Sequence, residues 1–135
     1  MAYIDWTEEF SVNVREIDAH HKKLLDYINI LHQSLLDNKG AEAQKITVNG
    51  MVDYTDFHFT AEEKLMLRHN YPQYQKHKLE HGKFTEMALD LQQRTNDAGF
   101  VLTLEILNFL KNWLQDHILI RDKEFSRHFN LNGVY

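Results

Sequence analysis

The chain contains no cysteine, and this absence excludes three kinds of site at once. Disulfides, iron–sulfur clusters and zinc sites with thiolate ligands all require cysteine sulfur. Any metal that the chain binds must therefore be held by nitrogen and oxygen ligands. Proline occurs once and glycine five times, so long stretches are free of the residues that interrupt helices.

Positive charge is also scarce. The 15 lysines and arginines are outnumbered by 20 acidic residues, which gives a formal net charge of -5 and argues against a nucleic-acid partner. No stretch is long and apolar enough to cross a bilayer. Residues 1–10 include Asp5, Glu8 and Glu9 and do not resemble a signal peptide. We expect a cytoplasmic protein, or the cytoplasmic domain of a larger receptor, with no membrane contact by this domain itself.

Length and composition predict one folded domain. The 135 residues are 43% apolar and 26% charged, which is typical of a soluble globular chain with a continuous core. We expect a single domain over 1–135, made of an N-terminal arm (1–17), a helical bundle (18–128) and a C-terminal tail (129–135).

Four segments carry apolar side chains at alternating steps of four and three residues, which predicts helices with one buried face. They run from about 18 to 38, 41 to 69 and 72 to 95, and a fourth follows the turn at 96–99 with Ile106, Leu110, Trp113, His117 and Ile120 on its seam. Asp18 is a candidate N-cap, Gly40 a candidate stop for the first helix, and Pro72 suits a first helical turn. Short connections predict an all-α, up-down-up-down antiparallel four-helix bundle.

Histidine lies on the inward seam of every predicted helix. Two pairs, His58 with Glu62 and His77 with His81, are four residues apart, which places both members of a pair on one helix face. A dry core cannot satisfy so many imidazole nitrogens without metal or a dense polar network. One four-coordinate zinc ion would leave part of these candidate ligands unused, whereas two metal ions would use all of them. The candidate metal ligands are His21, His58, Glu62, His77, His81, His117 and Asp122.

One spacing in this set does not fit a regular helix. His117 and Asp122 are five residues apart, so an ideal α-helix would turn their side chains about 140° from each other. We therefore predict a bend, bulge or interruption between Ile118 and Arg121. The other four histidines, His20, His32, His69 and His128, miss the seams or fall near a helix end, and we expect them on the solvated surface.

The ligand types leave the metal open. Imidazole suits iron, zinc, copper and nickel, and carboxylates suit hard, redox-active pairs such as iron. The ExxH motifs of ferritin-like di-iron and di-manganese enzymes are absent, and so is the HExxH motif of the usual zinc protease.

Several motifs along nearly the whole chain are similar to those of the hemerythrin family, and within it to the bacterial hemerythrin-like domains. These motifs are IDAHHK (17–22), HFTAEE (58–63), Tyr71-Pro72 followed by His77 and His81, and WLQDH (113–117) followed by Asp122. The family often has glutamine where this chain has His20, which makes the choice between His20 and His21 worth testing. The helical phase favours His21.

The resemblance implies two iron ions joined by a bridging oxo or hydroxo group. His77, His81 and His117 then correspond to the ligands of one filled iron, and His21 and His58 to those of a second iron with an open position for dioxygen. Glu62 and Asp122 correspond to the bridging carboxylates. An apolar pocket would keep oxygen binding reversible by excluding proton donors. The positions that match the family's oxygen pocket are Leu24, Phe59, Trp113, Leu114, Ile118 and Phe125.

Three functions remain open at this point, and we expect the first, a dioxygen-binding protein that is not an enzyme. The first is reversible binding of dioxygen for carriage, storage or delivery, with an unknown protein recipient. The second is an oxygen or redox sensor domain of a larger chemotaxis-type receptor, whose signalling domain would lie outside these residues. The third is an enzyme, either a di-iron peroxidase or oxidase or a metal-dependent hydrolase. Catalysis would require an acid or base near the open position, and the residues expected there are apolar.

Overall fold

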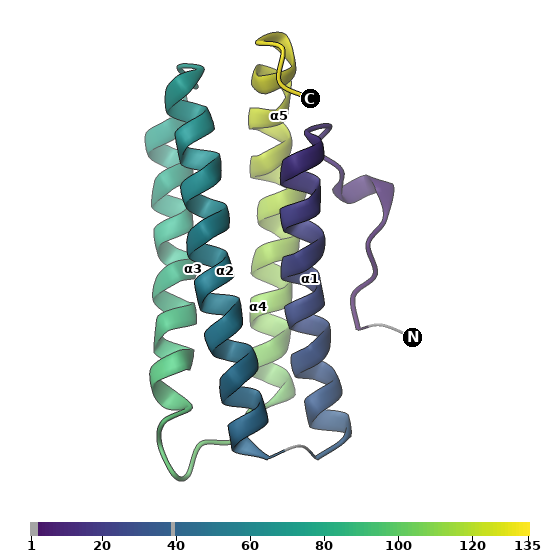
Figure 1. Ribbon diagram of the computed structural model, residues 1–135, viewed down its shortest axis with the longest axis vertical. Coiled ribbons are helices and arrows are strands. Elements are labelled where there is room, and N and C mark those ends of the chain that lie inside the picture. The colour runs from purple at the N-terminus through teal and green to yellow at the C-terminus, as the bar shows by residue number, and fades with distance from the viewer. Residues whose placement is uncertain (1–2, 39) are drawn as a thin grey trace.

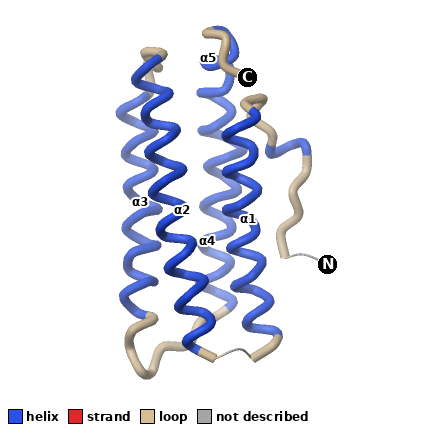
Figure 2. Tube along the Cα trace, in the orientation of Figure 1, coloured by secondary structure: helices blue, strands red, loops and turns tan. Residues whose placement is uncertain are grey.

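Four antiparallel helical columns lie side by side in a computed structural model, which describes residues 3–38 and 40–135 (Figure 1). No strand occurs in those residues, and helix fills the columns between short loops (Figure 2). The first three columns are α1 (Arg15–Leu36), α2 (Ala41–Arg68) and α3 (Tyr74–Arg94). The fourth consists of α4 (Leu104–Asp116), a π-helix η2 (His117–Asp122) and α5 (Lys123–Leu131). The predicted up-down-up-down bundle is confirmed.

The core follows the predicted apolar seams in the first three columns and differs in the fourth. The fourth seam was expected to include Ile106 and Ile120, but Ile120 is 55% exposed. The buried positions there include Leu107, Leu114 and Ile118. The π-helix has an extra residue in its turn, so the side chain of Ile120, three residues after His117, no longer faces the core.

Two helix ends lie away from their predicted positions. Helix α1 begins at Arg15, not at residue 18, so Asp18 is not an N-cap. The Asp18 carboxylate instead accepts hydrogen bonds from the Ser11 hydroxyl at 2.6 Å and the Val12 amide at 2.8 Å. At the other end, α5 continues to Leu131, beyond the predicted limit at 128.

Gly40 and Pro72 also have roles that differ from those predicted. Gly40 is the N-cap of α2, whereas α1 ends at Leu36 and is followed by Asn38 in the left-handed region at φ 51°. Asparagine tolerates that conformation better than most residues do. Pro72 lies in the turn before α3, which begins two residues later.

The N-terminal arm is packed against the bundle beside α1 (Figure 1). Asn29 of α1 makes two 2.9 Å hydrogen bonds with the backbone of Ile4, one to its amide and one to its carbonyl. Val12 and Val14 are almost fully buried. The first two residues of the predicted arm, and Lys39, lie outside the described residues. Within the described part of the chain, no helix has the length and apolar character needed to span a membrane.

Candidate metal centre

Seven polar side chains meet in the interior of the bundle, and none is more than 4% exposed. Helix α1 supplies one of them, α2 and α3 supply two each, and the two ends of η2 supply the last pair. They form two overlapping groups whose candidate ligand atoms lie within 4.8 Å of one another. The three-histidine group contains His77, His81 and His117, and the two-histidine group contains His21 and His58. Glu62 and Asp122 belong to both groups. All seven residues singled out in the sequence are thus brought together.

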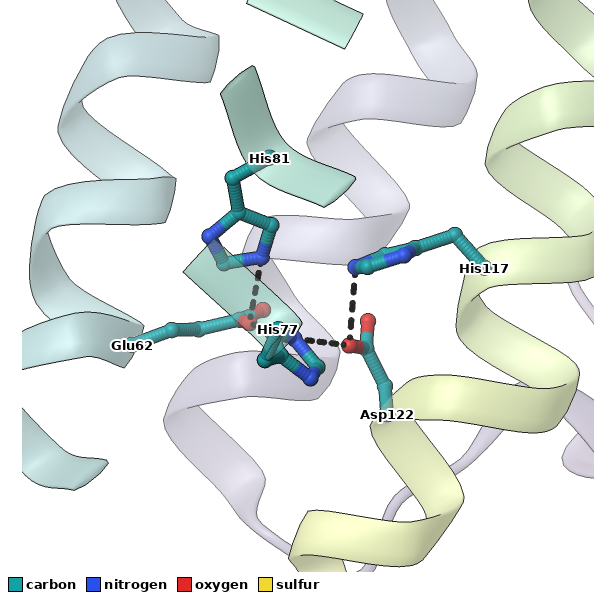
Figure 3. Close-up of side chains that lie close together, drawn as sticks. All are labelled: Glu62, His77, His81, His117 and Asp122. Atoms are coloured by element: carbon teal, nitrogen blue, oxygen red, sulfur yellow. Dashed lines mark ion pairs between the residues drawn. The ribbon is translucent and has the colours of Figure 1, made fainter. Parts of the chain in front are cut away.

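The three-histidine group converges on one face of the two carboxylates (Figure 3). Glu62 Oε2 lies 3.4 Å from Nε2 of both His77 and His81. Asp122 Oδ1 lies 3.0 Å from His77 Nε2 and 3.1 Å from His117 Nε2. Every imidazole in this group therefore presents Nε2 to a carboxylate oxygen.

The two-histidine group faces the other oxygens of the same carboxylates. Glu62 Oε1 lies 2.6 Å from His58 Nε2 and 3.4 Å from His21 Nε2. Asp122 Oδ2 lies 3.0 Å from His21 Nε2. Each carboxylate thus divides its two oxygens between the two groups, as a carboxylate bridging two metal ions would.

The polar atoms of the cluster fit a metal pair better than they fit one another. Among the described residues, eight buried side-chain atoms lack a hydrogen-bond partner, and six of these belong to the three histidines of the three-histidine group and to the two carboxylates. They are Nε2 of His77, His81 and His117, Oε2 of Glu62, and both carboxylate oxygens of Asp122. Buried polar atoms are rarely left unpaired, and metal coordination would supply the missing partners.

The π-helix explains how two ligands five residues apart share one site. An α-helix would turn Asp122 away from His117, but a π-helix has more residues per turn. The predicted irregularity between Ile118 and Arg121 lies inside η2, which runs from His117 to Asp122. This prediction is confirmed, and it brings Asp122 back to the face that carries His117.

The sequence model described as "Hemerythrin HHE cation binding domain" matches residues 12–128. The chain belongs to the hemerythrin family. It is 32% identical over 127 residues to a bacteriohemerythrin of Methylococcus capsulatus, covering 93% of this chain and 96% of that protein. A hemerythrin-like protein of Naegleria gruberi is 32% identical over 122 residues, or 90% of each chain.

Solved structures agree with this assignment. A crystal structure of wild-type hemerythrin superposes with a TM-score of 0.87 at 29% sequence identity, covering 93% of this chain and 97% of that one. Membership of the hemerythrin family implies a di-iron cofactor. The buried cluster of histidine, glutamate and aspartate is able to bind metal and fits such a cofactor.

An outer layer of carboxylates orients two imidazoles of this hemerythrin site. His81 Nδ1 lies 2.9 Å from Glu63 Oε2, and His117 Nδ1 lies 3.1 Å from Glu80 Oε2. Arg121 Nε donates to the other oxygen of Glu80 at 2.7 Å. Such partners fix ring orientation and make a ligand more basic. The sequence reading missed both glutamates, although Glu63 directly follows Glu62 in the HFTAEE motif.

His20 is the largest departure from the predicted set of surface histidines. It is only 6% exposed, and its Nδ1 lies 2.9 Å from Nδ1 of His58. The remaining three, His32, His69 and His128, are half-buried and not fully solvated. The arm covers His32 through a stacked Tyr3 ring, and His128 Nε2 contacts the carbonyl of His69. Tertiary contacts cover all four positions, which periodicity alone could not reveal.

Aromatic side chains surround the three-histidine group. Phe59 stacks on His81 at 3.8 Å between ring centroids, and Trp113 stacks on His117 at 4.7 Å. The edge of Phe125 meets His77 at 5.2 Å. These three predicted pocket residues thus lie against the three-histidine group. The other three, Leu24, Leu114 and Ile118, are almost fully buried.

Contacts within the hemerythrin cluster shift the pKa of its buried side chains. Burial alone would lower the pKa of His21, but its contacts with Asp122 and Glu62 outweigh burial and raise that pKa to about 9. The same balance raises the pKa of His77 to about 10. Burial would raise the pKa of the Glu62 and Asp122 carboxyls, but the surrounding histidines hold both well below their usual range. The buried histidines and carboxylates thus stabilise each other's charged forms.

Metal loading should therefore release protons. At pH 7 a metal must displace protons from His21 and His77, so apparent affinity should rise with pH until about 9 to 10. Conversely, the stability that these protonated groups give to the metal-free fold should be complete below pH 6.5 and decline between there and pH 9 to 10. Anaerobic calorimetry of iron binding in buffers with different ionisation enthalpies tests this. Equal heats in all buffers at pH 7 would contradict it.

Proposed function

We propose that the chain is a non-haem di-iron protein that binds dioxygen reversibly, for oxygen carriage, storage or delivery. The observation that carries the proposal is the division of each buried carboxylate between a three-histidine and a two-histidine group. In the proposal, His77, His81 and His117 hold one iron, His21 and His58 hold the other, and Glu62 and Asp122 bridge the pair together with an oxo or hydroxo group.

The unequal histidine count would distinguish the two iron positions. Three imidazoles and the bridges would fill one position, whereas two imidazoles and the same bridges would leave a ligand place open on the other. When bound, the iron pair supplies two electrons that dioxygen accepts and returns. The protein's own contribution is to hold this asymmetry in a rigid bundle, because ligands on helices are positioned more firmly than ligands on loops.

The surrounding residues would exclude water. All seven candidate ligands are buried, and Leu24, Leu114 and Ile118 are almost fully buried apolar side chains. They offer no acid or base, which supports a carrier over an enzyme that activates oxygen or consumes peroxide. Catalytic turnover of peroxide beyond a few equivalents per iron pair would contradict that part of the proposal.

The test is optical. Anaerobically reduced protein should be nearly colourless, should colour on exposure to air, and should lose the colour when oxygen is removed. Iron analysis on the same sample should give about two irons per chain, as the two ligand groups require. Retention of the colour after deoxygenation would contradict reversible binding.

A further inference from the structure

His20 occupies a buried place between α1 and α2, on the outer side of the two-histidine group. Its Nδ1 lies 2.9 Å from His58 Nδ1, and its Nε2 points to the exposed Glu16 at 3.9 Å. The rings of His20 and His58 are nearly perpendicular, at 86°. This histidine is outside both groups of candidate ligands.

The chemistry of His58 determines what His20 must do. His58 presents Nε2 to the cluster, 2.6 Å from Glu62 Oε1. A neutral imidazole that binds metal through Nε2 carries its proton on Nδ1, which then needs an acceptor. The hydrogen-bond partner of His58 Nδ1 is Nδ1 of His20. His20 must therefore carry its own proton on Nε2, on the side of Glu16.

Packing holds His20 in this orientation. The edge of the Tyr54 ring lies against it with centroids 5.9 Å apart, and Phe57 covers it at 5.1 Å. The outer partner of His58 is thus a neutral imidazole, whereas His81 and His117 have carboxylate partners. His20 therefore orients His58 without adding a negative charge beside the two-histidine group.

We propose that His20 is a positioning residue for the two-histidine metal position, where it accepts the Nδ1 proton of His58 and so directs His58 Nε2 at the metal. The inference rests on the proposed di-iron function. It assigns a role to the residue in which this chain departs from the glutamine that is common in the family.

Two substitutions at the same position separate this role from simple packing. His20→Leu fills the space and removes the acceptor, whereas His20→Gln keeps a neutral acceptor in its amide oxygen. His32→Leu is the matched control, because His32 lies on the same helix and stacks on Tyr3 instead of a candidate ligand. The measurement is loss of ferrous iron to a chelator under anaerobic conditions at pH 8.

We expect His20→Leu to bind one of its two irons about 10- to 100-fold more weakly. His20→Gln should recover most of that loss, and His32→Leu should behave like the unaltered protein. Equal retention of both irons in His20→Leu and the unaltered protein would overturn the proposal. A His20→Gln variant as weak as His20→Leu would do the same.

A second measurement uses the unaltered chain and does not depend on how the variants fold. Nitrogen-15 NMR of the protein loaded with diamagnetic Zn²⁺ should show a proton on Nδ1 of His58 and none on Nδ1 of His20. The opposite pair of tautomers would overturn the proposal. Oxygen binding enters neither readout, so irreversible oxidation in air would contradict the proposed function and leave this inference standing.

Discussion

Replacement of Glu62 by alanine is expected to abolish binding of both irons. Glu62 is fully buried and its two oxygens face both histidine groups, so no other single change except one at Asp122 touches both positions. Removing one partner of a buried charge network costs roughly 3–5 kcal/mol of unfolding free energy, because it leaves the others uncompensated. The melting temperature should fall by about 10 °C or more, and further through loss of metal stabilisation.

Two other variants provide comparisons for this result. Glu63→Ala removes the partner of His81 Nδ1 and keeps all seven candidate ligands, so metal affinity should fall only about 10- to 100-fold. His32→Ala should leave the iron content unchanged. The measurements are iron per folded chain and thermal unfolding by circular dichroism. An iron content near two in Glu62→Ala would contradict the bridging assignment, and His77→Ala should lose metal as well.

The second large effect is expected from Leu24→Asn, which should speed oxidation of the oxygenated protein by about tenfold or more, equivalent to ~1.4 kcal/mol in the barrier. Leu24 is 1% exposed and lies three residues after His21, and a helical side chain leans toward the preceding turn. An amide there would place proton donors beside the two-histidine position. Proton donors promote release of reduced oxygen, which leaves both irons oxidised.

Leu31→Asn provides the control for Leu24→Asn. Leu31 is fully buried in the same helix, ten residues from His21 or about 15 Å along the axis. Both variants lose similar contacts and bury the same amide, so each should lose roughly 2–5 kcal/mol of stability. Only Leu24→Asn should shorten the lifetime of the oxygenated spectrum after mixing with air. Equal lifetimes in the two variants would show that Leu24 does not protect the oxygen site.

Much of the candidate centre was predictable because its signals are local. A helix repeats every 3.6 residues, so the pairs His58–Glu62 and His77–His81 have to share a face wherever helices form. The same arithmetic showed that His117 and Asp122 require an irregular turn, which η2 supplies. Absence of cysteine limited the ligands to nitrogen and oxygen donors.

The tertiary structure decided which atoms meet across the bundle. The Glu80 carboxylate on α3 contacts His117 in the fourth column, although Glu80 is adjacent to His81 in the chain. The tertiary structure also places His20 behind His58 and divides the oxygens of Glu62 between two groups. Helical periodicity fixes angles within one helix, whereas these contacts depend on the rotation and axial offset of neighbouring helices. Packing of the whole core sets both quantities, and no local pattern encodes them.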